Sequence, residues 1–81
     1  MDADVVMYKG YEIHATPKQR RDSGEWTMEI TISRHHEGEV RERMYSAGDS
    51  YTTLEEAVAH CVNFGRQVID GNTPNCSVEG L

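Results

Sequence analysis

The sequence predicts a two-layer α+β domain, in which a curled antiparallel β-meander of about four strands is covered by one C-terminal amphipathic helix, in the order ββββα. In the N-terminal part of the chain, apolar and polar residues alternate over short segments, which is typical of strands with one buried face. Residues 54–70 instead repeat their apolar residues with the period of a helix. One helix covers such a sheet only if the sheet twists and curls around it. We therefore expect a single domain over residues 1–71.

Four segments have strand character. They are residues 5–8, 11–16, 25–34 and 40–46. Lys9–Gly10 provides a turn or a bulge between the first two, and residues 35–39 form a hairpin loop in which Gly38 is suited to a positive φ. The third segment has the clearest alternation, and its shared apolar face consists of Trp26, Met28, Ile30 and Ile32.

The fourth segment also has two distinct faces. Val40 and Met44 are expected on the face that turns toward the helix. Arg41, Arg43 and Tyr45 are then expected on the outward face, where the arginines could pair with glutamates of the neighbouring strand.

Both ends of the predicted helix are marked in the sequence. Thr53 is a good N-cap, Glu56 completes a capping box, and Gly71 can adopt the left-handed conformation that ends a helix. The apolar stripe consists of Leu54, Val58, Cys61, Gly65 and Val68. Glycine at position 65 costs about 1 kcal/mol relative to alanine. This cost predicts that another backbone, such as a crossing strand, approaches the helix closely there.

Charge and hydropathy limit the classes of partner. The 81 residues carry a net charge of −6, from 14 acidic and 8 basic residues, which argues against nucleic acid as the default partner. No apolar run approaches the roughly 20 residues of a transmembrane helix, and the N-terminus lacks the basic start of a signal peptide. We expect a cytoplasmic protein without membrane contact. Residues 72–81 show no periodicity and are predicted to form a disordered tail.

No catalytic, metal or cofactor site is predicted. His35 and His36 are adjacent, so on an extended segment their side chains point in opposite directions and chelate poorly. Cys61 lies on the apolar helix stripe and Cys76 in the tail, and both are expected as free thiols without the fixed, activated geometry of a nucleophile. We therefore expect a protein that is not an enzyme.

An interaction surface is the remaining prediction. Its candidate residues are Tyr8, Arg34, Arg41, Arg43 and Tyr45. Tyrosine and arginine are the usual anchors of protein interfaces, so the favoured hypothesis is a protein-interaction module that binds a host protein or associates with itself. The alternative is a weak nucleic-acid-binding module, in which Arg41, Arg43 and Tyr45 form a basic face on the hairpin.

The chain resembles a group of very small uncharacterised proteins of proteobacterial genomes, some of them in prophage regions. The resemblance rests on the run Tyr8-Lys9-Gly10-Tyr11-Glu12-Ile13, the Trp-containing strand, and the helix from Thr53-x-x-Glu56-Ala57 to Val68-Ile69-Asp70-Gly71. It spans about residues 5–71 and implies strands followed by one helix. It also implies a prophage-associated origin, and it carries no activity or binding residues onto this chain.

Overall fold

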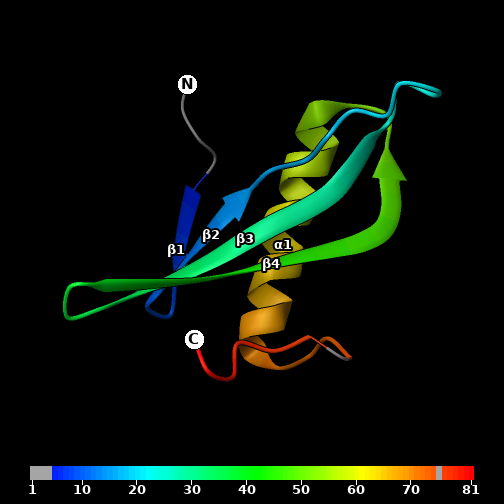
Figure 1. Cartoon of the computed structure of the whole chain (residues 1–81). Helices are drawn as coiled ribbons and strands as arrows, with labels where there is room; N and C mark the ends of the chain where they lie inside the picture. Colours follow the sequence, from blue (N-terminus) through cyan, green and yellow to red (C-terminus); the bar gives the residue numbers. More distant parts are fainter. Residues whose placement is uncertain (1–4, 75) are drawn as a thin grey trace.

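Four strands form one antiparallel sheet, and a single helix lies against one of its faces, behind the sheet in Figure 1. The computed structural model describes residues 5–74 and 76–81. The elements are β1 (Val5–Tyr8), β2 (Tyr11–Ala15), β3 (Trp26–His36), β4 (Glu39–Tyr51) and α1 (Leu54–Asp70). The strands follow one another in the sheet in sequence order, and the sheet is open. The predicted ββββα arrangement is confirmed.

The β3–β4 hairpin is tighter than predicted. Its turn consists of Glu37–Gly38, with φ of 32° and 87°, and β3 continues to His36. The predicted loop of residues 35–39 is thus reduced to two residues, both with positive φ, the geometry that fits the right-handed twist of paired strands. Lys9–Gly10 joins β1 to β2 in the same way.

β4 is also longer than predicted. It runs to Tyr51, and its last part pairs with the beginning of β3 after a register shift between Thr27 and Met28. Such an irregularity increases the local twist and bends the strand. The bend visible in Figure 1 brings the chain directly to the start of α1.

The helix ends are closed as the sequence indicates, with one difference. The Thr53 hydroxyl accepts a hydrogen bond from the backbone N–H of Glu56 at 3.1 Å. The Glu56 carboxylate, however, accepts from the Thr52 hydroxyl at 2.9 Å, so no return bond to the N-cap completes the capping box. At the other end, Gly71 has φ of 80°, and Gly71 and Asn72 donate their N–H groups to carbonyls of the last turn.

The core lies between α1 and the middle of the sheet. α1 buries Ala57, Cys61, Gly65 and Val68. Ile13 on β2 and Ile30 and Ile32 on β3 are completely buried beneath it. The close approach predicted at Gly65 is present, but the group that approaches is the Ile13 side chain. Leu54, predicted on the apolar stripe, is 45% exposed.

The predicted faces of β4 are wrong. Tyr45 is only 9% exposed and lies opposite Ile30, on the side of the helix. Met44 is 68% exposed, and Val40 lies on the same outward side.

The tight hairpin turn explains this reversal. Because His36 pairs with Glu39 across two turn residues, every even-numbered residue of β3 up to the bulge faces an odd-numbered residue of β4. Arg43 therefore lies opposite Ile32, and Arg41 opposite Arg34, on the helix side. Successive side chains of a strand point to opposite faces of the sheet. Lengthening or shortening the loop by one residue therefore exchanges the buried and exposed faces of β4.

Residues 76–81 differ from the disordered tail that the sequence predicts. Cys76 and Val78 pack on the core, and Leu81 is 8% exposed. α1 lies mainly over β2 and β3, so the helix side of β4 needs another cover. The apolar side chains of the tail provide that cover, and Figure 1 shows the tail passing near β4 below the sheet.

An ion pair joins the end of α1 to the β1–β2 turn. The Asp70 carboxylate accepts a hydrogen bond from Lys9 Nζ at 2.6 Å and from the Tyr8 hydroxyl at 2.9 Å. These two donors, Lys9 first, hold the pKa of Asp70 below its ordinary value of 3.8.

This lowered pKa predicts a pH dependence of stability. A carboxyl with a lower pKa in the folded chain stabilises the fold above its unfolded pKa, and loses this effect as pH falls through its folded pKa. We expect Asp70→Asn to lower the urea midpoint at pH 7 and to flatten the loss of stability below about pH 4. Lys9→Met should have a similar effect, because it removes the same pair. Parallel pH profiles for the wild type and Asp70→Asn would contradict this assignment.

Within the residues that the structure describes, no helix combines the length and the apolar character needed to cross a membrane.

Candidate interaction surface

The residues predicted to form an interaction surface all lie on the helix side of the sheet and are engaged within the chain. They are Tyr8, Arg34, Arg41, Arg43 and Tyr45. Tyr8 is bonded to Asp70, and Arg34 donates to the Tyr11 hydroxyl at 3.0 Å while its guanidinium lies 5.1 Å from the ring centre. The other three contact the tail. The structure brings these three together beneath the tail, where Tyr45 is buried while Arg41 and Arg43 stay exposed and each donate one hydrogen bond to it.

The opposite face of the sheet, here called the outer face, carries the exposed apolar residues. Of the five large apolar side chains with high exposure among the described residues, four belong to it: Val5, Met7, Val40 and Met44. The register explains their common face, since side chains directly opposite in paired strands point to the same side.

The outer face has apolar rims and a polar centre. One row across the four strands consists of Val5, His14, Thr31 and Met44. The next row consists of Met7, Glu12, Ser33 and Glu42. The edge strands β1 and β4 thus supply the methionines, and the central strands supply mostly polar side chains.

Three titratable side chains meet in the polar centre. The Nε2 atoms of His14 and His35 lie 3.3 Å and 3.2 Å from the same carboxylate oxygen of Glu12. Hydrogen bonds, from His35 first and also from His14, lower the pKa of Glu12 and favour its charged form. Beside it, Ser33 is 1% exposed, and its hydroxyl has no hydrogen-bond partner among the described residues. No group of three or more His, Cys, Asp or Glu in the described part of the chain is arranged to hold a metal ion.

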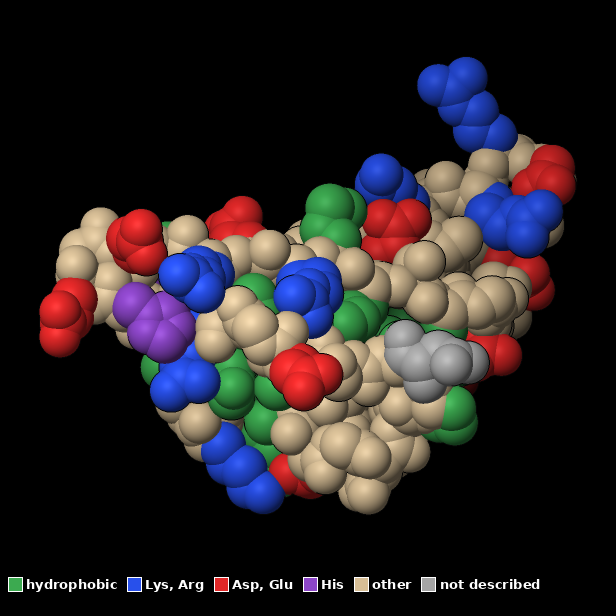
Figure 2. All heavy atoms as spheres, turned by 60° about the horizontal axis from the view of Figure 1, so that its bottom comes forward, with side chains coloured by type: hydrophobic (Ala, Val, Ile, Leu, Met, Phe, Trp, Pro, Cys, Tyr) green, Lys and Arg blue, Asp and Glu red, His purple; other side chains and the backbone are tan. Residues whose placement is uncertain are grey.

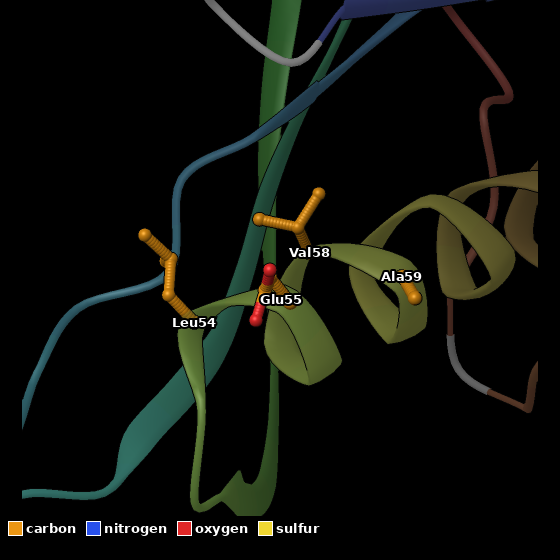
Figure 3. Close-up of a pocket in the computed structure, with 4 residues that line it drawn as sticks. All are labelled: Leu54, Glu55, Val58 and Ala59. Carbon is orange, nitrogen blue, oxygen red and sulfur yellow. The ribbon is translucent and has the colours of Figure 1, made fainter.

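A shallow hollow beside α1 is a weaker candidate for a binding site than the outer face. It has a volume of about 300 Å³ and is lined by Leu54, Glu55, Val58 and Ala59. Figure 3 shows that all four come from the first turns of one helix, with Leu54 and Val58 pointing to the same side. A hollow lined by one element cannot surround a small ligand in the way a binding pocket does.

Charges of both signs are interspersed near the hairpin. In Figure 2 the hairpin end, at the left, shows acidic and basic side chains side by side. The sequence contributes Glu37, Glu39 and Glu42 to the same stretch as Arg41 and Arg43. No continuous basic stripe appears on this view of the molecule.

Sequence reasoning missed the outer face because it assigned the wrong side to β4. The signal that could have found it is the Glu37–Gly38 turn. A two-residue hairpin loop fixes which residues lie opposite one another, and it pairs Ile30 with Tyr45 and leaves Met44 outward.

Comparison with known proteins gives one family finding. Residues 1–79 match the model of a family described as a domain of unknown function, DUF6566. No curated protein and no solved structure matches the chain.

Proposed function

The chain belongs to this family of unknown function, and from its geometry we propose that it is a non-enzymatic protein-interaction module that docks through the outer face. The observation that carries the proposal is the gathering of Val5, Met7, Val40 and Met44 on the face opposite the helix. We further propose a cytoplasmic accessory protein of proteobacterial, prophage-associated origin, which the resemblance of its opening strands and capped helix supports.

The apolar rims supply the affinity in this proposal. Single exposed apolar residues are common, and a partner is indicated where such residues lie together. Val5 with Met7 and Val40 with Met44 form two exposed groups at the opposite edges of the outer face. Met7 and Met44 are 64% and 68% exposed, so most of their area remains to be buried by a partner. Full burial of such a side chain contributes about 1.5–3 kcal/mol. Methionine also adapts its shape to a partner surface more easily than branched side chains.

The charges of the outer face indicate the chemistry of the partner. Glu12 and Glu42 lie on this face in the same row as Met7, and the whole chain has a net charge of −6. A second copy would place these glutamates against their own counterparts, which is unfavourable. The face therefore fits a partner protein with an apolar contact surface fringed by lysine or arginine.

The alternative of nucleic-acid binding has no comparable support. Arg41 and Arg43 lie on the helix side of β4, and each donates to a backbone carbonyl of the tail. Both arginines stay exposed, but each uses one guanidinium donor in this bond, and nucleic-acid binding draws on several basic side chains that face the phosphates together. The acidic net charge adds to this argument.

The test compares two matched surface variants in an affinity capture from bacterial lysate, with and without nuclease. Met7→Ser/Met44→Ser removes apolar area from the outer face, and Leu54→Ser removes an exposed apolar side chain, 45% accessible, from the helix. We expect a protein recovered by the wild type and by Leu54→Ser to be lost with the double variant. The same loss should be reproduced with the purified partner, and binding should weaken moderately as salt rises.

Three results would contradict the proposal. The double variant could retain every protein that the wild type recovers. Recovery could disappear with nuclease, which would favour nucleic acid. Light scattering could show a dimer that the double variant abolishes, which would make a second copy the occupant of the outer face.

A further inference from the structure

The tail is held to β4 by side chains that donate to its backbone. Residues 76–81 are here called the strap. Arg43 Nη1 donates to the Ser77 carbonyl at 3.1 Å, and the Tyr45 hydroxyl donates to the same oxygen. Arg41 Nη1 donates to the Gly80 carbonyl at 3.2 Å. These bonds involve only the main chain of the strap, so they do not depend on which side chains the bound segment carries.

The side chains of the strap alternate between the core and solvent. Cys76 and Val78 pack on the core cluster, while Ser77 and Glu79 are exposed. Leu81, which is 8% exposed, also packs on the core cluster. Residues 76–78 thus pass the core with alternate side chains inward, and a turn closed by the bond from the Leu81 N–H to the Val78 carbonyl, with Gly80 at a φ of 88°, then brings Leu81 onto the core.

The rest of the fold does not depend on the strap for its backbone hydrogen bonds. Among the described residues, the strap makes no backbone-to-backbone hydrogen bond with the sheet, and the N–H of Leu81 bonds within the strap itself. The end of α1 is closed separately by Gly71 and Asn72. The strap can therefore leave β4 without breaking the sheet or unwinding the helix.

We propose that the helix side of β4 is a peptide-binding surface and that the strap is its resident ligand. The partner that displaces the strap is a short peptide segment of another protein that follows the path of the strap, with apolar residues at the positions of Cys76, Val78 and Leu81 and a glycine at the turn position of Gly80. Tyr45, together with Arg43 and Arg41, which follow it along the same face of β4 toward the hairpin, would anchor it, and these residue types dominate the energetics of protein interfaces. This surface lies on the opposite side of the sheet from the outer face, so the inference goes beyond the proposed function and can fail separately from it.

The test uses the full chain and the two cysteines as reporters. Cys76 lies on the strap, whereas Cys61 is completely buried, bonds to the Glu29 carbonyl, and has its pKa raised by burial. We measure the rate of alkylation of each thiol by mass spectrometry, with a synthetic peptide of residues 72–81 that carries Cys76→Ser. A tethered strap competes at a millimolar effective concentration, so the peptide is added up to about 5 mM.

We expect the peptide to accelerate alkylation of Cys76 several-fold and to leave Cys61 unchanged, whereas a scrambled peptide has no effect. Arg43→Ala should accelerate alkylation of Cys76 without any peptide, and it should weaken binding of a fluorescent copy of the peptide to the protein. Arg20→Ala is the matched control, because Arg20 pairs with Asp22 in a distant loop.

Two outcomes would overturn the proposal. One is an alkylation rate of Cys76 that neither the peptide nor Arg43→Ala changes. The other is a concentration-dependent dimer that the free peptide dissociates, because this would make the strap of a second copy the occupant instead of a different protein.

Discussion

Tyr45→Ala is expected to lower the free energy of unfolding by about 3 kcal/mol, whereas Met44→Ala should change it by less than about 0.5 kcal/mol. The two residues are neighbours on β4, but Tyr45 is buried against Ile30 and Met44 points to solvent from the outer face. Removing the tyrosine ring leaves a cavity between sheet, helix and strap. Removing the exposed methionine side chain leaves none.

The measurement is urea denaturation of the two variants beside the wild type. Tyr45→Phe separates the ring from its hydroxyl, since it removes only the bond to the Ser77 carbonyl and should cost about 1 kcal/mol. A large loss for Met44→Ala together with a small one for Tyr45→Ala would mean that β4 presents the opposite face.

Gly65→Leu is expected to destabilise the protein by about 3 kcal/mol, despite the better helix propensity of leucine. A Cβ atom at position 65 would lie 2.6 Å from Cγ2 of Ile13 and 3.0 Å from its Cδ1. Ile13 is completely buried, so it has little room to move away. Helix and strand would have to separate.

A double-mutant cycle tests this contact directly. Ile13→Ala removes all the side-chain atoms that would clash, so the combination with Gly65→Ala should cost less than the sum of the two single variants. Gly48→Leu is the matched control, because nothing lies within 4 Å of a Cβ at position 48 and its φ is not positive. Additive effects in the cycle would show that Gly65 does not contact Ile13.

The sequence by itself determines the local elements of this protein. The period of the apolar residues in residues 54–70, the Thr53 cap and Gly71 together specify a helix over the residues where the structure has it. These signals act within one or two turns of the chain, so they are independent of the rest of the fold. The glycine at position 65 likewise indicates a close neighbour of the helix, but the sequence does not identify that neighbour as Ile13.

Only the tertiary structure decides which side of β4 is buried and what covers it. The alternation of Val40 and Met44 with Arg41, Arg43 and Tyr45 is compatible with either side, and the register set by one two-residue turn makes the choice. For this reason the proposed interaction surface is the outer face, and not the surface that the sequence predicts. The strap is too short for its sequence to show what it packs against, and it docks because α1 lies mainly over β2 and β3 and leaves the helix side of β4 uncovered. Burial of its apolar side chains compensates the entropy lost in docking, and that gain depends on a surface formed by residues far away in the sequence.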